Sequence, residues 1–244
     1  MGGPLQASLS NALLRSLPAE SYAAVAAHLE PVDLPLRFKL ADPKQPYSWV
    51  YFPESGIASV IAPVGDTWQE IGLFGRDGVG GVAALLSTQR PSFEVIMQVA
   101  GHGHRIPLAE MARLFQQNAD VRDMVLRYIR AAFFQLSQSA LANTQLNVEQ
   151  RLARWLLMVH DRIDGDVIKL THEYLAIMLG VSRTTVTLAL HALERARLIG
   201  RARAQIIVAD RAGLEQLADQ LYRVLEPPHD RAAASRMLPQ MAAI

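Results

Sequence analysis

Apolar and polar positions follow their most informative pattern between residues 170 and 208. Thr171 can cap a helix, and an apolar face follows at helical spacing, formed by Leu175, Met178 and Leu179. Gly180 ends this helix and Val181 fills the turn. The pattern predicts a short amphipathic helix that stops at a glycine.

A second helix is predicted directly after this turn, because Ser182 can cap it. Its buried face has spacings of four and three residues and consists of Val186, Leu190 and Leu193. Its opposite face carries Arg183, Thr184, Thr187, Leu188 and His191. A short helix, a glycine turn and a second helix that presents its first residues outward form a helix-turn-helix, whose second helix fits the major groove of DNA.

A basic hairpin is predicted after the second helix, with strands at Ile199 and at Ile206–Val208. Between Ser182 and Gln205 five arginines stand against one glutamate. An ordinary helical hairpin with a solvated basic face is the alternative, but the cap, turn, core spacing and hairpin all agree with DNA binding. We expect the groove to be read by Ser182, Arg183, Thr184, Thr187, Leu188 and His191, and the DNA backbone to be held by Thr171, Arg201 and Arg203.

This stretch resembles the C-terminal winged helix-turn-helix of the Crp/Fnr transcription regulators, the superfamily of the cyclic AMP receptor protein and the fumarate-nitrate reduction regulator. The matching residues are Leu170-Thr171, Leu175-Ala176, Leu179 through Arg183, Thr185-Val186, Leu190, Leu193-Glu194 and Leu198-Ile199. In the receptor protein the recognition helix begins Ser-Arg-Glu-Thr-Val and carries another arginine further along. Thr184 and Leu188 stand at the positions of that glutamate and that arginine. The resemblance implies DNA binding, but two of the three side chains that would read the receptor protein's operator have changed chemistry.

The N-terminal half has a different pattern of apolar residues. It predicts two helices, Leu9–Leu17 and Pro18–Leu29, followed by a series of short strands. The predicted strands are Leu34–Leu40, Ser48–Phe52, Gly56–Ala62, Trp68–Phe74 and Phe93–Ile106. Tyr51–Gly56 and Ile71–Gly78 are similar to the β-roll of Crp/Fnr regulators that lack an obvious cyclic-nucleotide site. Members that bind the nucleotide hold its phosphate with a Gly-Glu pair and an Arg-Ser pair. The nearest positions here are Gly78, Gly80, Arg90 and Ser92, without the glutamate and with a proline between Arg90 and Ser92. We therefore predict no tight cyclic AMP binding and no cofactor, and an effector, if there is one, of unknown identity.

A long helix is predicted from Ala119 to about Leu141, preceded by a helix from Pro107 to Phe115. Its apolar stripe is formed by Val125, Ile129, Ala132, Leu136 and Ala140, and is widened by Leu126, Phe133, Phe134 and Leu141. Such a helix packs on two sides. The resemblance implies that the second side is a twin helix in a homodimer, which would read a palindromic operator with half-sites about one DNA turn apart. The alternative is a buried helix of a monomer. The resemblance also implies RNA polymerase as a partner.

The expected fold class is α+β, with an N-terminal double-stranded β-helix (a jelly-roll like a cyclic-nucleotide-binding domain), a long dimerisation helix and a C-terminal winged helix-turn-helix. The corresponding domains are residues 1–116, 117–146 and 147–226, followed by a loose tail at 227–244. In the third domain we predict helices at Asn147–Arg162 and Gly213–Leu225, and a strand at Val167–Leu170.

Composition narrows the possible functions. The net charge is only +1, but residues 1–116 carry 8 basic and 10 acidic side chains, whereas residues 151–244 carry 13 and 10. The absence of cysteine excludes disulfides, cysteine-bound zinc and a cysteine-bound iron–sulfur cluster. No apolar run approaches the length of a membrane span and no signal peptide is recognisable, so we predict a cytoplasmic protein.

Two further motifs resemble sites for a dinucleotide and for a metal ion. Gly78–Ala83 fits the dinucleotide fingerprint G-x-G-x-x-A, but residues 95–109 lack the acidic residue that would bind the ribose. His102 and His104 could lie on one face of a strand, but no third metal ligand is near, and two surface histidines are the simpler interpretation. We therefore predict neither a metal site nor an enzyme. The competing interpretations are a small-molecule signalling protein with a vestigial DNA-binding module, which Leu188 favours, and an NAD-dependent enzyme, which rests on the glycine run alone.

Overall fold

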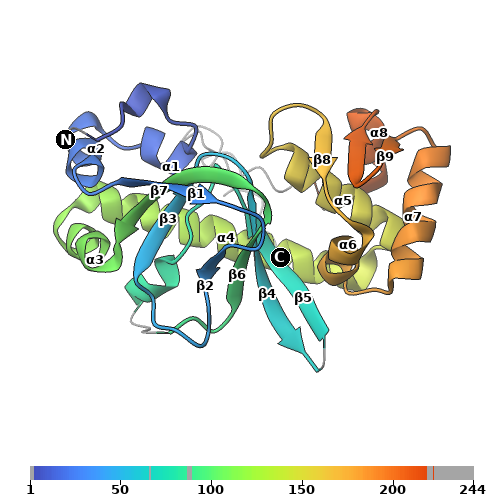
Figure 1. Ribbon diagram of the computed structural model, residues 1–244, viewed down its shortest axis with the longest axis horizontal. Helices are drawn as coiled ribbons and strands as arrows, with labels where there is room; N and C mark the ends of the chain where they lie inside the picture. The colour runs from blue at the N-terminus through green and yellow to red at the C-terminus, as the bar shows by residue number, and fades with distance from the viewer. Residues whose placement is uncertain (1–2, 66, 87–89, 219–221, 223–244) are drawn as a thin grey trace, which may run out of the picture.

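The computed structural model describes residues 3–65, 67–86, 90–218 and 222. Figure 1 shows a β-rich half at one end, a helical half at the other, and the long helix α4 running between them. The helices are η1 (Gln6–Ser8), α1 (Ala12–Arg15), α2 (Ala19–Ala26), η2 (Val82–Leu86), α3 (Leu108–Gln117), α4 (Ala119–Gln145), α5 (Val148–His160), α6 (His172–Leu179), α7 (Arg183–Arg195) and α8 (Arg211–Ala218). The strands are β1 (Glu30–Leu34), β2 (Lys39–Ala41), β3 (Trp49–Pro53), β4 (Ile57–Val64), β5 (Thr67–Phe74), β6 (Glu94–Val99), β7 (Gly101–Pro107), β8 (Val167–Lys169), β9 (Ile199–Ala202) and β10 (Gln205–Val208). The predicted fold class, with an N-terminal β domain, a long helix and a C-terminal helix-turn-helix, is confirmed.

Two antiparallel sheets form the β-rich half, with strand orders β1-β7-β3 and β2-β6-β4-β5. Two of the strand predictions are wrong. Leu34–Leu40 is not one strand, because β1 ends at Leu34 and a turn with Arg37 at φ 68° precedes β2. Phe93–Ile106 is two strands, β6 and β7, which lie in different sheets. Period-two patterning cannot reveal where a chain leaves one sheet for the other.

The long helix α4 runs four residues further than predicted, from Ala119 to Gln145. The Asn118 side chain caps its start by accepting a hydrogen bond from the Val121 N–H at 3.1 Å. Its buried face consists of Val121, Met124, Val125, Gln138 and Ala142. Its other side exposes large apolar residues to solvent, namely Leu126, Phe133, Phe134, Leu136 and Leu141. One helix therefore carries both a core face and an uncovered apolar face.

The C-terminal module, comprising α5 to α8 and the sheet β8-β10-β9, is built around α5. A capping box between Asn147 and Gln150 starts this helix, and every residue from Leu152 to Val159 is buried. Helices α6, α7 and α8 contact α5, and the core of the module also includes Ile57, Ile61 and Leu73 from the β-rich half. The two halves therefore share one hydrophobic cluster, while two further clusters lie outside the C-terminal module.

Polar contacts reinforce this junction. The Arg162 guanidinium of the loop after α5 makes a two-pronged ion pair with the carboxylate of Asp77, with N···O distances of 2.6 and 2.9 Å. Burial opposes ionisation of Asp77, but Arg162 holds the pKa of that carboxyl below its usual value. On the neighbouring strand β5, Glu70 accepts hydrogen bonds from Trp155 Nε1 at 2.9 Å and from Ser59 Oγ at 2.5 Å. These contacts place the C-terminal module on β4 and β5.

The last predicted helix, Gly213–Leu225, begins two residues earlier than expected, at Arg211, and is described to Ala218. Beyond it only Tyr222 is described, so the expected tail at 227–244 lies outside the described residues. No single helix in the described ranges is long and apolar enough to cross a bilayer. Helices α6 and α7 meet that test only as a pair bent by 102°, and their apolar faces belong to the module's core.

Candidate nucleic-acid interface

Helices α6 and α7 form the predicted helix-turn-helix, and their local sequence sets each boundary. The Thr171 hydroxyl caps α6 by accepting from the Tyr174 N–H, and the Ser182 hydroxyl caps α7 by accepting from the Thr185 N–H at 3.1 Å. Gly180 ends α6 with φ 62°, a left-handed backbone that glycine adopts without strain. The 102° bend between the helices lies in the range typical of this motif.

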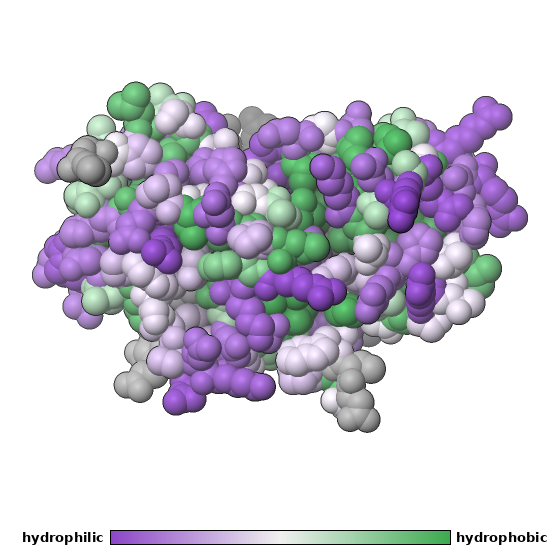
Figure 2. All heavy atoms as spheres, in the orientation of Figure 1, coloured by the Kyte–Doolittle hydropathy of each residue, from purple (hydrophilic) through white to green (hydrophobic). Residues whose placement is uncertain are grey.

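The outward face of α7 begins with exposed Ser182, Arg183 and Thr184 and continues to exposed Leu188 and His191. Figure 2 shows that hydrophilic residues predominate at the edge of the molecule where α7 lies. Thr187 differs from the others. It is half-buried, and its hydroxyl donates to the Arg183 carbonyl at 3.0 Å and lies 3.2 Å from His172 Nδ1. The Thr187 hydroxyl is thus engaged within the helix-turn-helix rather than presented to solvent.

The hairpin β9–β10, which we call the wing, turns at Arg203 and Ala204 and pairs with β8 through β10. Ala204 adopts φ 53° in this turn. A groove of about 660 Å³ separates the wing from the starts of α6 and α7. Its charged and polar lining includes Thr171, His172, Glu173, Arg183, Arg201, Arg203 and Gln205. Three arginines, one from α7 and two from the wing, therefore meet at one groove.

The three arginines are not equivalent. Arg201 forms an ion pair with Glu194 of α7 and donates to His191 Nδ1 at 3.0 Å. The hydrogen bond from Arg201 holds the pKa of the Glu194 carboxyl below its usual value. Within the described ranges, no ion pair involves Arg183 or Arg203. Arg201 therefore fastens the wing to α7, while Arg183 and Arg203 present their charges to the groove.

His172 is one of the groove residues that sequence reasoning missed, together with Glu173 and Gln205. It lies directly after the Thr171 cap, at the first position of α6, and that position beside the cap is the signal that could have drawn attention to it. Burial lowers the pKa of the His172 imidazole, and the nearby charges of Arg201 and Arg183 lower it further. Burial and the neighbouring positive charges therefore both favour the neutral imidazole at this position.

The glycine run at 78–81 is packed against the β-roll instead of forming a phosphate cradle. The Gly80 N–H donates to the Tyr51 carbonyl at 2.8 Å, and the Gly78 N–H donates to the Gly75 carbonyl at 3.0 Å. A Cβ at Gly78 would lie 2.7 Å from the Phe74 side chain, and one at Gly81 would lie 2.6 Å from the Trp49 carbonyl. The run leads into η2, which spans only Val82–Leu86, so it lacks the long helix that a dinucleotide site requires.

The other weak nucleotide candidates lie on an exposed part of the chain. Arg90 is exposed and donates to the Lys44 carbonyl at 3.5 Å, Ser92 is exposed, and Pro91 between them is buried. The groove beside the wing and the pocket lined by Arg37, Lys39 and Glu94 include none of Gly78, Gly80, Arg90 and Ser92.

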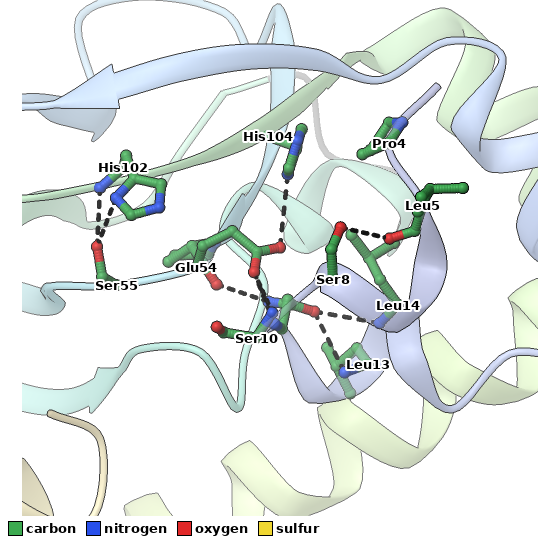
Figure 3. A network of polar contacts seen from close by, with 12 residues as sticks. Pro4, Leu5, Ser8, Ser10, Leu13, Leu14, Glu54, Ser55, His102 and His104 are labelled. Carbon is green, nitrogen blue, oxygen red and sulfur yellow. Dashed lines mark hydrogen bonds and ion pairs between the residues drawn. The ribbon is translucent and has the colours of Figure 1, made fainter. Parts of the chain in front are cut away.

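The two histidines of β7 have separate partners, as Figure 3 shows. His102 is exposed and lies 2.9 Å from Ser55 Oγ. His104 is not a surface residue, since its side chain is 15% exposed and lies 3.4 Å from the buried Glu54 carboxylate. Glu54 in turn accepts from the N–H groups of Ser10 and Asn11, which fastens the N-terminal segment to the β-roll. No group of three potential metal ligands occurs in the described part of the chain.

Comparison with known proteins follows the same division of the chain. Residues 150–217 match the family described as the Crp-like helix-turn-helix domain. This part of the chain is therefore a Crp-like helix-turn-helix domain. This match confirms the resemblance first seen in residues 170–199. No curated protein matches the chain significantly by sequence.

Solved structures share the whole fold. FixK2 from Bradyrhizobium japonicum is 16% identical with a TM-score of 0.67, and the match covers 78% of this chain and 96% of that one. A CRP-family transcriptional regulator from Thermus thermophilus is 18% identical with a TM-score of 0.65, covering 77% and 96%. The c-di-GMP responsive global regulator CLP from Xanthomonas campestris is 19% identical with a TM-score of 0.62, covering 78% and 99%. At these identities the comparisons establish the fold alone.

Proposed function

We propose that this Crp/Fnr chain is a cytoplasmic, homodimeric transcription regulator that binds a palindromic DNA site with α7 in the major groove. The groove between the wing and the start of α7 supports this proposal most directly, because Arg183 and Arg203 present unpaired guanidinium groups there. Anionic phosphates and the acceptor edge of guanine are the partners that such groups bind best in DNA.

Each side chain has a distinct role in this proposal. Arg183, at the first turn of α7, grips guanine O6 and N7, while the start of the helix at Ser182 faces a phosphate. Thr184, Leu188 and His191 complete the groove-facing stripe. Thr171 and Arg203 contact the DNA backbone.

Arg201 and Thr187 have supporting roles. Arg201 orients the wing through Glu194, and Thr187 steadies the first turn of α7 through its bond to the Arg183 carbonyl. Arg201 would still contribute its charge to the potential that attracts the DNA backbone.

A second copy of the chain is the proposed cover for the exposed apolar face of α4. Leu126 and Phe133 lie seven residues apart, as do Phe134 and Leu141, which is the spacing at which two helices pair along their length. Phe133 is 72% exposed, an unusual state for a phenylalanine on a stable helix. Pairing of α4 with its twin would relate two α7 helices by a two-fold axis, as a palindromic site requires.

We propose that regulation does not use cyclic AMP. The backbone donors at Gly78 and Gly80 are already bonded within the β-roll, and neither the Gly-Glu pair nor the uninterrupted Arg-Ser pair is present. A different small-molecule effector remains compatible with the β-roll, and RNA polymerase is the partner that family membership suggests.

Selection from randomised duplexes at ~0.15 M salt, with and without cyclic AMP, tests the proposal, because phosphate-only binding is weak under this condition. We expect a two-fold symmetric sequence to be enriched equally in both cases. Enrichment only with cyclic AMP would overturn the account of the β-roll. No enrichment in either case would favour a signalling protein with a vestigial DNA-binding module.

Arginine substitutions on α7 test the proposed contact at the level of one residue. Arg183→Ala should weaken binding to the enriched site by ~1–3 kcal/mol and relax the preference at one base pair of each half-site. Arg195→Ala is the matched control, since Arg195 is an exposed arginine in the last turn of the same helix. Equal losses from both variants on specific and random DNA would contradict base reading by Arg183.

A further inference from the structure

Leu188 is anomalous on the outward face of α7. It is 65% exposed, whereas the apolar residues that join α7 to the core, Val186, Leu190 and Leu193, are at most 1% exposed. Leu188 packs in none of the hydrophobic clusters, so its side chain does not serve the fold of the described residues. It lies one helical turn after exposed Thr184 and in the middle of the surface proposed to meet DNA.

The chemistry of the major groove limits what Leu188 can recognise. An isobutyl group has no donor or acceptor, so it cannot read the polar edges of guanine, adenine or cytosine. Placed against those edges it would remove their water without replacing the hydrogen bonds. The thymine C5-methyl is the apolar group that a base edge presents in this groove.

We infer that Leu188 reads a thymine methyl group, so that each half-site carries a required T·A pair in addition to the pair contacted by Arg183. The inference rests on the proposed DNA-binding function and adds the identity of one base. Leu188 follows Arg183 by five positions, which is about 7.5 Å along the helix axis, against about 3.4 Å between stacked bases, so the two side chains address different base pairs. An exposed leucine on this helix is then a specific contact and not a sign of lost DNA binding.

Removal of single methyl groups from the DNA tests this inference. Each thymine of the enriched site is replaced in turn by deoxyuridine, which keeps base pairing and the minor groove but lacks the C5-methyl. Affinity is measured by fluorescence anisotropy for the full-length wild type, Leu188→Ala and the control Leu36→Ala. Leu36 is 50% exposed and lies in the β-rich half, so its variant carries the same chemical change away from α7.

We expect one symmetric pair of deoxyuridines to weaken wild-type binding by about fourfold per half-site, or roughly 15-fold for the dimer, which is the value of one buried carbon per contact. The Leu36→Ala variant should show the same loss. Leu188→Ala should bind the natural site more weakly and be insensitive to the same methyl removal, because the contact is already absent.

Two results would overturn the inference while leaving the proposed function intact. One is an enriched site at which no thymine methyl matters to the wild type, and the other is a methyl effect of unchanged size in Leu188→Ala. If no symmetric sequence is enriched at all, the proposed function itself is wrong and the inference falls with it. Circular dichroism of Leu188→Ala should match the wild type, because the side chain is exposed.

Discussion

Glu70 should make the stability of this protein fall as pH rises. Its carboxylate lies between β5 and α5, where burial raises its pKa to about 7 although Ser59, Trp155, Arg154 and Arg162 favour the ionised form. The folded chain therefore holds a proton on Glu70 that the unfolded chain releases near pH 4.5. Stability due to the protonated carboxyl is fully present below pH 4.5 and is lost as pH rises through about 7.

The size of the effect follows from the two pKa values. Integrating proton release between pH 5 and pH 8 gives a loss of about 2.5 kcal/mol in the free energy of unfolding. Glu70→Gln has no proton to lose and keeps a side-chain carbonyl that can accept from Trp155 Nε1. This variant should therefore lack that component of the pH dependence and should be more stable than the wild type at pH 8.

Urea unfolding of the full-length protein at pH 5 and at pH 8, with the protein concentration held constant, measures the difference in the free energy of unfolding. Glu54→Gln is the matched control, because Glu54 is a buried glutamate whose pKa is shifted the other way. Burial would raise the pKa of Glu54, but His104 and the N–H groups of Ser10 and Asn11 hold it below its usual value.

Glu54→Gln leaves Glu70 in place, so this variant should keep the fall in stability between pH 5 and pH 8 that Glu70 causes. If Glu70→Gln retains the wild-type difference between pH 5 and pH 8, the carboxylate at the junction is not the group that titrates.

Three further predictions concern the turn, the dimer and the wing. Gly180→Ala should destabilise the protein by at least the ~1–2 kcal/mol of a left-handed alanine, because its Cβ would also lie 3.0 Å from the end of the Gln69 side chain of β5. Gly165→Ala, at φ 76° in open space, should show the backbone strain alone. Denaturant midpoints measure both losses, and equal losses would show that the Gln69 side chain moves aside. Phe133→Asp should convert the proposed dimer into a folded monomer, because the Phe133 ring is exposed in a single chain. Sedimentation measures the mass, and an unchanged mass would place the dimer contact elsewhere. Arg203→Ala should reduce the slope of log binding constant against log salt concentration by about one unit per half-site and leave the base preference unchanged. A changed base preference would assign Arg203 to base reading.

Much of the helix-turn-helix followed from local sequence. Thr171, Gly180 and Ser182 set the boundaries of α6 and α7 through caps and a left-handed turn, which involve residues at most four apart. The identity of the outward face of α7 followed from helical spacing in the same way. These features depend on near neighbours in the chain, and near neighbours can be identified without a tertiary structure.

Contacts between distant segments required the structure. Spacing alone placed Arg201 and Arg203 on the same hairpin tip, but only the packed wing shows that Glu194 engages Arg201. The glycine run matched a dinucleotide fingerprint, yet close contact with Phe74 of β5 at Gly78 and with Trp49 of β3 at Gly81 explains why these two positions have no side chain.

The sequence by itself determined the local elements of the DNA-binding half and its resemblance to Crp/Fnr regulators. Tertiary structure alone decided that β6 and β7 belong to different sheets, that Glu70 is enclosed against Trp155, and that the two halves share one hydrophobic cluster. The physical reason is that burial and charge pairing depend on residues brought together from 85 or more positions apart, as for Glu70 with Trp155 and Asp77 with Arg162. Hydrophobic patterns with a period of two, three or four residues cannot reveal contacts between such distant residues.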